Sequence, residues 1–557
     1  MQAEAISESS ASRPLLETQS HPQQYKHWKL RVEGPAAYLI LDVQEGGGYL
    51  PGYALKLNSY DISVDVELAD AVTRLRFEHP EVSVVVLTSA RERLFCAGAN
   101  IFMLRGASHP FKVNFCKYTN ETRLAMEEAS AHSGQYYLAA LNGLASGGGY
   151  ELALACKEIH LIDDHSSVVS LPEIPYLGVL PGTGGLTRLV DKRHVRRDLA
   201  DVFCTLAEGV KGRRAKEWNL VDEVHPPSQW EEMIAKRVAE LVREGATQQG
   251  IALEPLVKER RGNEIIYKHL TLSVEPDARV ARLTLRGPAT STAETPLPDN
   301  AAQAGSGWYP LALFRELDDV LVELRFNFEE IGLILIRSEG ELESVMALDR
   351  QLRARPDDWF LREVRLLIGR TLKRLELTAR SIFTLIEGNS CFGGFLFELA
   401  LASDRIYMRD DADDPAGIAL SPLNEGAFPM GNGLSRLAQR FCGNPEHPRR
   451  LDTGKEPHLS AQQALDAGLV TAAPDELDWE DEVRLAIEER TSLSPDALTG
   501  MEASLRFAGP ETMESKIFGR LSAWQNWIFQ RPNATGERGA LTLYGEPERP
   551  RFDRHRT

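Results

Sequence analysis

Hydrophobic and polar residues alternate along this chain with two different periods. Two short runs, Ala37–Val43 and Val280–Leu285, alternate in a way that predicts half-buried β-strands. The stretch from Arg362 to Leu377 instead carries apolar residues at helical spacing, which predicts a helix with one face in a core: Val364, Leu367, Ile368, Leu372 and Leu375. Strands and helices succeed one another, which is typical of an α/β protein with open, partly parallel sheets.

This pattern occurs twice. The strand-like run Val84–Ser89 returns as Leu333–Ser338, and Glu151–Ala155 returns unchanged as Glu398–Ala402. Two further pairs keep the same order and spacing: Gly184–Leu189 with Asn432–Leu437, and Ala215–Val221 with Ala464–Val470. The spacing of roughly 250 residues far exceeds the roughly 20–50 residues of a solenoid repeat. The sequence therefore predicts two homologous modules, module one over residues 25–265 and module two over residues 266–500, followed by a helical C-terminal extension and tail over 501–557.

The composition narrows the class of protein. A chain of 557 residues is long enough for several domains, at about 100–200 residues each. The net charge of −18 argues against nucleic-acid binding, since phosphate backbones attract basic surfaces. No apolar run approaches the roughly 18 residues that could span a bilayer, so no membrane partner is expected.

The N-terminal segment and the cysteines indicate a cytoplasmic protein. Residues 1–24 are rich in Ser, Gln and Glu and lack the basic start and apolar core of a signal peptide, so we expect a disordered leader. The six cysteines form no CxxC pair and have no histidine at zinc-finger spacing. Neither a disulfide framework nor a zinc site is therefore expected, and reduced thiols fit a cytoplasmic location.

Three consecutive glycines, Gly147 to Gly149, stand shortly before the apolar helix expected over Leu152–Cys156. Glycines leave backbone N–H groups uncovered by side chains. At the start of a helix such donors also lie at the positive end of the helix dipole, which suits an anionic oxygen. A tight turn without a ligand would have the same sequence, so this motif alone does not decide between the two interpretations.

Four short motifs follow one another in module one: AGAN at 97–100, GGGYE at 147–151, LPEI at 171–174 and PGTGG at 181–185. Their order and spacing resemble those of the crotonase (enoyl-CoA hydratase/isomerase) family, and the resemblance covers module one almost entirely. It implies α/β modules of the ClpP/crotonase type in tandem, and an enzyme that acts on an acyl-coenzyme A thioester. It implies neither a metal nor a redox cofactor, because coenzyme A is part of the substrate.

The resemblance assigns roles to individual residues. The backbone N–H groups of Ala99 and Gly148 would form an oxyanion hole for the thioester oxygen as it becomes an enolate. Fixed donors aimed at developing charge are often the largest catalytic contribution, about 3–4 kcal/mol for one donor. Glu151 and Glu173 match the two acidic positions of the family and would share acid and base work on water and protons. Taken alone, either glutamate could be a solvated or helix-capping side chain.

Further residues are expected around the acyl group. Gly98, Gly147 and Tyr150 would contact the substrate. Cys116 lies in a stretch that lines the acyl pocket in the family, where it could assist the chemistry, although a buried, inert thiol is the alternative. This chain departs from the common family pattern at two positions, since Asn100 replaces the usual Asp and Tyr150 replaces a small residue. Both changes could reshape the acyl pocket.

Module two has lost this constellation. Residues 344–348 replace the AGAN loop, Phe395 replaces the middle glycine, and residues 421–423 replace the second glutamate motif. Glu398 remains alone, so we expect module two to be structural. Four arginines close to the C-terminus could contact a CoA phosphate, but a solvated tail is the simpler interpretation: Arg549, Arg551, Arg554 and Arg556.

Within the family, the length, the degenerate second module and the retained glutamate pair resemble a ring-cleaving branch. That resemblance implies conversion of 2,3-epoxy-2,3-dihydrobenzoyl-CoA and two waters to 3,4-didehydroadipyl-CoA semialdehyde and formate. One alternative is an ordinary 2-enoyl-CoA hydratase or isomerase. Another is a non-catalytic scaffold that binds CoA esters, although a scaffold needs no pair of acids. Single-module relatives form trimers and hexamers, and for this tandem chain we expect a homodimer or another homo-oligomer.

Overall fold

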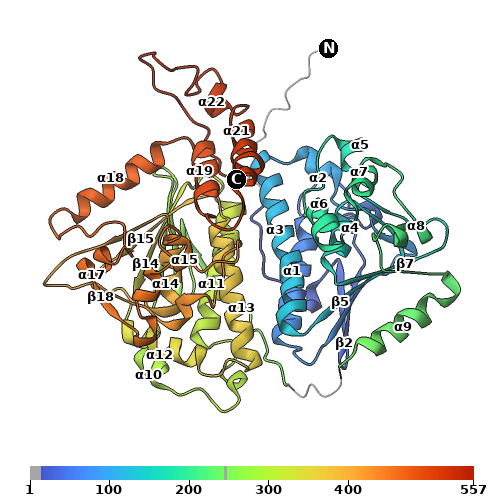
Figure 1. Cartoon of the computed structure of the whole chain (residues 1–557), viewed down its shortest axis with the longest axis horizontal. Helices are drawn as coiled ribbons and strands as arrows, with labels where there is room; N and C mark the ends of the chain where they lie inside the picture. Colours follow the sequence, from blue (N-terminus) through green and yellow to red (C-terminus); the bar gives the residue numbers. More distant parts are fainter. Residues whose placement is uncertain (1–13, 244–247) are drawn as a thin grey trace.

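The computed structural model describes residues 14–243 and 248–557. Two α/β units lie side by side (Figure 1), with module one drawn in blue to green and module two in yellow-green to red. Helices α1, α3, α11 and α13 stand where the two units meet. Their bounds are Ile62–Phe77, His109–Glu128, Tyr309–Asn327 and Trp359–Glu376. No helix in these described ranges is both long enough and apolar enough to cross a membrane.

Module one contains a six-stranded sheet and a smaller one. The large sheet has the order β1-β2-β3-β5-β7-β9, in which only the β1–β2 pair is antiparallel. Its strands are Trp28–Glu33, Ala36–Leu41, Val84–Ser89, Tyr136–Leu141, Glu158–Ile162 and Glu223–His225. The small sheet is parallel and has the order β4-β6-β8, with strands Arg93–Cys96, Gly143–Ser146 and Val169–Ser170. The remaining helices of this module are α2 Ile101–Gly106, α4 Gly148–Ala155, α5 Glu173–Leu177, α6 Gly185–Thr187, α7 Arg197–Thr205, α8 Gly212–Glu217 and α9 Trp230–Leu241.

Module two repeats the large sheet with added antiparallel strands at one edge. Its seven strands run in chain order from β10 to β16 and become parallel from β13 onward. They are Glu259–Arg261, Glu264–Ile266, Leu270–Glu275, Val280–Arg286, Leu333–Glu339, Ser381–Ile386 and Arg405–Met408, and a separate pair is formed by β17 Gly417–Ala419 and β18 His458–Ser460. The sheet thus begins slightly before residue 266, where we expected the module to start. The other helices are α10 Thr290–Glu294, α12 Leu342–Arg353, α14 Gly394–Leu401, α15 Arg436–Arg440, α16 His447–Arg450, α17 Ala461–Asp466 and α18 Trp479–Ser492.

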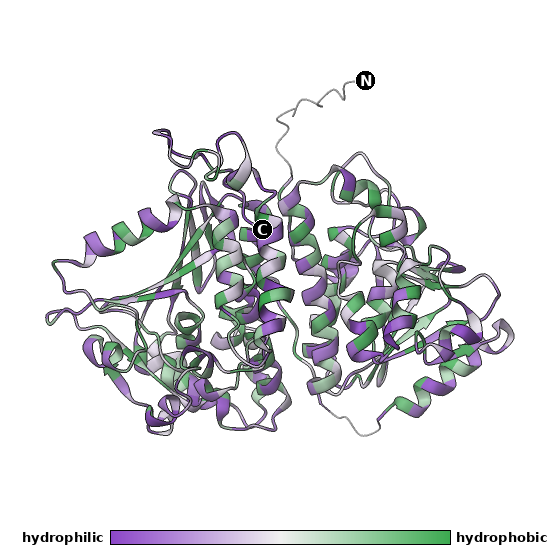
Figure 2. Cartoon of the chain, turned by 45° about the horizontal axis from the view of Figure 1, so that its top comes forward, coloured by the Kyte–Doolittle hydropathy of each residue, from purple (hydrophilic) through white to green (hydrophobic). Residues whose placement is uncertain are grey.

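The helices between the modules are amphipathic. Figure 2 shows hydrophilic and hydrophobic segments alternating along them. The apolar stripe expected in Arg362–Leu377 lies on α13, and all five of its predicted core residues are buried. Helix α3 begins at a Ser108 cap, whose side chain accepts a hydrogen bond from the N–H of Phe111, and Pro110 fits its first turn. Local sequence therefore sets where this helix begins.

The N-terminal segment differs from the expected disordered leader. Residues 1–13 lie outside the described residues, but from residue 14 onward the chain packs against module two. Leu16 is only 3% exposed, and its backbone N–H donates to Oδ1 of Asn327 on α11 at 2.9 Å. The buried Leu16 side chain and its backbone hydrogen bond to Asn327 hold this segment against the protein, although its composition is polar. We call residues 14–24 the N-terminal strap.

The C-terminal region is helical in part, with α19 Pro495–Leu505, α20 Met513–Lys516, α21 Ser522–Ile528 and α22 Pro532–Thr535. Arg549, Arg551 and Arg554 are exposed, as expected of a solvated tail, but Arg556 corrects that expectation. Arg556 is buried, and its guanidinium donates to the carbonyl of Ala379 at 2.7 Å and to Glu502 at 3.0 Å. The chain end is therefore part of the packing of module two.

Candidate active site

The glycine-rich turn joins β6 to α4 and leaves no room for a side chain at Gly147, Gly148 or Gly149. Gly147 has a φ of 52°, and a Cβ atom added there would lie 2.6 Å from Oε1 of Glu173. A Cβ on Gly148 would lie 1.9 Å from the hydroxyl of Tyr60. No larger residue fits either position without displacing a neighbour. The turn therefore lies directly against Glu173 on one side and Tyr60 on the other.

The AGAN loop packs directly against this turn. A Cβ on Gly98 would lie 2.9 Å from the nitrogen of Gly148, so the two segments are in close contact. The flanking backbone groups are used: Tyr60 N–H donates to the Gly98 carbonyl at 3.0 Å, and Asn100 N–H donates to the Tyr60 carbonyl at 2.8 Å. Across residues 14–243 and 248–557, no acceptor is recorded for the N–H of Ala99 or Gly148. Unused amides are unusual at a buried turn and suit an anionic oxygen.

Glu151 is the more tightly held of the two carboxylates. It lies in the first turn of α4 and is 2% exposed. Its Oε1 accepts hydrogen bonds from the backbone N–H of Thr183 at 2.9 Å and of Gly185 at 2.8 Å, while Oε2 accepts from the Thr183 hydroxyl. The PGTGG motif is therefore the clamp that fixes this carboxylate.

Glu173 has the opposite environment. It begins the short helix α5 and is half-buried, and its Oε2 is a buried oxygen with no partner among the described residues. Burial, together with the nearby charge of Glu151, raises the pKa of Glu173 to about 7. A carboxyl with this pKa can take up and release a proton near neutral pH, as acid–base catalysis requires.

Cys116 and Tyr150, the other side chains predicted at the site, lie in different surroundings. Cys116, on α3, lies near the PGTGG turn, since a Cβ on Gly182 would be 3.2 Å from its sulfur. Burial and the nearby Glu151 raise the pKa of the Cys116 thiol to about 11, so it is protonated at neutral pH. Tyr150 is fully buried, and its hydroxyl donates to the Leu220 carbonyl at 2.7 Å, which places it in the packing behind the turn. It is therefore not positioned for the substrate contact that we expected.

The side chain of Asn100 holds the AGAN loop in place through hydrogen bonds. Its side-chain oxygen caps α2 by accepting from the Met103 N–H at 3.0 Å, and its amide donates to the Ala54 carbonyl at 2.8 Å and the Ser59 hydroxyl at 3.1 Å. An aspartate could make the cap but could donate neither of the other bonds. The replacement of Asp by Asn thus fits a structural role in holding the AGAN loop.

Sequence reasoning missed Arg123 on α3. Its guanidinium is fully buried and donates to the Gly148 carbonyl at 3.0 Å and to the Tyr60 hydroxyl at 3.2 Å. Asp65 on α1 lies 3.8 Å from it and is its charged partner. Nothing in the sequence singled it out, because α3 carries several other charged residues. Its contact with the glycine turn depends on the fold.

In the corresponding turn of module two, side chains of the same module bind the backbone amide and the glutamate. The backbone N–H of Phe395, at the position of Gly148, donates to Oδ2 of Asp349 at 2.9 Å, and the hydroxyl of Ser421 donates to the same oxygen at 3.0 Å. Glu398 is buried and receives hydrogen bonds from Asn424 and Arg436, each at 2.8 Å. The amide that could serve an oxyanion and the remaining glutamate are therefore both committed to internal partners.

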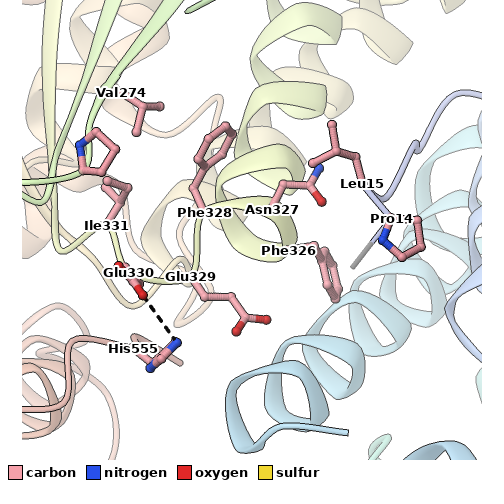
Figure 3. A pocket seen from close by; sticks show the side chains of 11 residues that line it. Pro14, Leu15, Val274, Phe326, Asn327, Phe328, Glu329, Glu330, Ile331 and His555 are labelled. Atoms are coloured by element: carbon pink, nitrogen blue, oxygen red, sulfur yellow. Dashed lines mark ion pairs between the residues drawn. The ribbon is translucent and has the colours of Figure 1, made fainter. Parts of the chain in front are cut away.

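A pocket of about 330 Å³ lies elsewhere, between the N-terminal strap, the end of α11 and the C-terminal tail (Figure 3). Phe326, Phe328 and Ile331 contribute apolar surface, and His555 pairs with Glu330 at 3.9 Å. None of the predicted site residues lines it. Within the described part of the chain, no three His, Cys, Asp or Glu side chains gather as metal ligands would.

The sheets of module one and the four motifs that they bring together are those of the crotonase class of enzymes. The chain belongs to the enoyl-CoA hydratase/isomerase family, whose family model matches residues 55–272. Among curated proteins, benzoyl-CoA-dihydrodiol lyase from Aromatoleum evansii is 51% identical over 545 residues, which cover 97% of this chain and 98% of the relative.

Two other similarities are confined to part of the chain. The fatty acid oxidation complex subunit alpha from Shewanella loihica is 31% identical over 199 residues, which cover 36% of this chain and 26% of the relative. A crystal structure of an enoyl-CoA hydratase from Geobacillus kaustophilus is 32% identical, covers 39% of this chain and 75% of its own, and superposes with a TM-score of 0.35.

Proposed function

We propose that this chain is a lyase that cleaves the ring of an aromatic-derived acyl-CoA. One observation carries the proposal: the similarity to benzoyl-CoA-dihydrodiol lyase extends over 97% of the chain, and so includes module two. The family model, in contrast, matches little beyond module one. A similarity that includes the degenerate module favours the tandem, ring-cleaving branch over single-module hydratases.

The proposed reaction converts 2,3-epoxy-2,3-dihydrobenzoyl-CoA and two waters to 3,4-didehydroadipyl-CoA semialdehyde and formate. The N–H groups of Ala99 and Gly148 hold the thioester oxygen while electrons flow into the carbonyl. Glu173 takes up and releases the protons, because its pKa lies near neutrality and one of its oxygens is unpaired. Glu151, fixed by the PGTGG clamp, orients water. Cys116 contributes a protonated thiol to the wall of the site, and the proposed reaction uses only the CoA ester and water.

The test is direct conversion of the enzymatically prepared epoxide by purified, chelator-treated protein. We expect one equivalent of formate for each semialdehyde, measured by mass spectrometry and a formate assay. Crotonyl-CoA should be hydrated slowly, because a site shaped for a six-membered ring positions a short linear chain poorly. Fast hydration of crotonyl-CoA without formate release from the epoxide would instead establish an ordinary 2-enoyl-CoA hydratase.

We also propose that the chain is cytoplasmic and forms a homodimer or another homo-oligomer. All six cysteines are free, which supports a reducing compartment. The segment after Glu173 exposes apolar side chains next to the site, with Tyr176 at 69%, Val179 at 52% and Leu180 at 63% exposure, and a second copy could cover them. Light scattering on the eluted protein tests the assembly, and a monomeric mass would overturn it.

A further inference from the structure

Helix α3 has one face toward each module. Its module-two face makes buried ion pairs with α11 and α13. Glu121 on this face accepts two hydrogen bonds from Arg325, at 2.9 and 2.8 Å, and one from Arg374 at 2.9 Å. Burial alone would raise the pKa of Glu121, but the two arginines lower it to about 2. This carboxylate is therefore charged at any working pH and firmly bound to module two.

A second contact lies further along the same interface. Arg76 of α1, whose side chain is fully buried, pairs with Glu128 of α3 at 2.9 Å and with Glu363 of α13 at 2.7 Å. Asn114 of α3 adds a hydrogen bond to the Arg325 carbonyl at 3.2 Å. Helix α3 is thus held against module two from near its first turn to its last residue. Buried, multiply bonded arginines of this kind fix geometry more than they add stability.

The other face of α3 carries Arg123, two residues after Glu121. Its guanidinium donates to the carbonyl of Gly148, the residue whose N–H is one of the two unused amides of the site. It also contacts the Tyr60 hydroxyl, which lies against the same glycine. Because a helix moves as a rigid unit over a few residues, a shift of Glu121 would displace Arg123. The carbonyl of Gly148 would follow, and with it the N–H of the same residue, because the two groups are joined through the Gly148 Cα atom.

We infer that module two takes part in catalysis by positioning the oxyanion turn: Arg325 and Arg374 hold Glu121, α3 transmits that position, and Arg123 holds the Gly148 carbonyl. Glu121 is then a positioning residue that lies outside the substrate site. Both arginines belong to module two, so within this chain module one alone lacks these contacts. The assay rests on the proposed function, whereas the inference concerns the site geometry alone.

The test replaces Glu121 by Gln in the full chain. We expect kcat on the epoxide to fall about tenfold or more while KM changes less than about threefold, because a misdirected oxyanion donor weakens mainly the transition state. The matched control is Glu158→Gln. Glu158 is also a carboxylate held at a pKa of about 2, by His160 and Arg237, but it lies on β7 and touches neither α3 nor the turn. Its replacement should leave kcat unchanged.

A vibrational measurement on the bound thioester distinguishes a failure of the proposed function from a failure of this inference. Bound, carbonyl-labelled benzoyl-CoA should show a lowered thioester C=O stretching frequency in the wild type and a smaller shift in Glu121→Gln. If the wild type polarises the carbonyl but releases no formate, the proposed function fails and the inference is still tested by the shift. If Glu121→Gln does not fold, Arg374→Lys, which keeps the charge but loses the planar fork, replaces it. A folded variant with wild-type kcat and a wild-type carbonyl shift would overturn the inference.

Discussion

At the scale of single residues, the two glutamates illustrate how surroundings divide the work of identical side chains. Glu151 receives three hydrogen bonds from the PGTGG motif, so its carboxylate has donors on both oxygens. Glu173 has an unpaired buried oxygen and a pKa raised to about 7. Two carboxyl groups in different environments can take different roles in acid–base catalysis. The structure thus supplies the asymmetry that the sequence left open.

We predict that Glu173→Gln folds normally and loses about a hundredfold or more of its activity, because general acid–base groups contribute roughly 10²–10⁴-fold. The variant should also be more stable than the wild type in alkali. Glu173 ionises near its ordinary pKa of 4.5 in the unfolded chain but only at about 7 in the folded chain. Between these values the folded chain binds more protons, so stability falls as the pH rises through this window.

Denaturant titrations at several pH values check this stability effect. At pH 8 the variant should exceed the wild type by about 2 kcal/mol in free energy of unfolding, and the difference should vanish near pH 4. A variant that is less stable than the wild type at pH 8 would show that the folded protein does not disfavour the charged form of Glu173. Near-wild-type turnover would remove it from the mechanism.

At the scale of elements, the turn before α4 is the part most dependent on backbone geometry. We predict that Gly148→Ala lowers kcat about a hundredfold or more, since the added methyl group meets the Tyr60 hydroxyl and displaces an oxyanion donor. Gly106→Ala is a suitable control, because a Cβ on Gly106 meets no atom within 4 Å. Unchanged kinetics in a folded Gly148→Ala protein would contradict the assigned role of this turn.

The elements also show what the sequence could and could not reveal. Motifs whose backbone shape demands glycine, such as Gly147, are visible because the constraint is local. Arg123 was not visible, since its partners come from segments distant along the chain. Tyr150 was assigned to the substrate on its neighbours in sequence, but helical geometry turns its side chain toward Leu220. The polar composition of residues 14–24 concealed the anchoring by Leu16 for the same reason, because its partner lies on α11.

At the scale of the whole molecule, the two modules have diverged from a common pattern into different tasks. Among the described residues, module one keeps unused amides and an unpaired carboxyl oxygen at its site, whereas the Phe395 amide and the Glu398 carboxylate of module two have internal partners. Glu398, the remaining glutamate of module two, is paired with Arg436, which also contacts Glu376. The second module therefore has the buried ion pairs of a structural core where the first has a reactive site.

We predict that Glu398→Gln leaves kcat unchanged and lowers stability by about 3 kcal/mol, the lower end for breaking a buried ion pair, because Glu376 remains as a partner for Arg436. Thermal denaturation and steady-state kinetics on the same preparation distinguish the two effects. A large loss of kcat without loss of stability would mean that module two is itself catalytic.

The carboxylate of Asp349, which binds the backbone amide of Phe395 in module two, has a consequence for hydrogen exchange. The amide of Phe395 already has a partner, so it should exchange slowly with deuterium whether or not a CoA ester is present. The amide of Gly148 has none in the free chain, so its exchange should slow only when a thioester oxygen arrives. The Asp349 carboxylate thus occupies in module two the position that a thioester oxygen would take in module one. Comparing the exchange rates of the two amides would report how much protection the substrate itself confers.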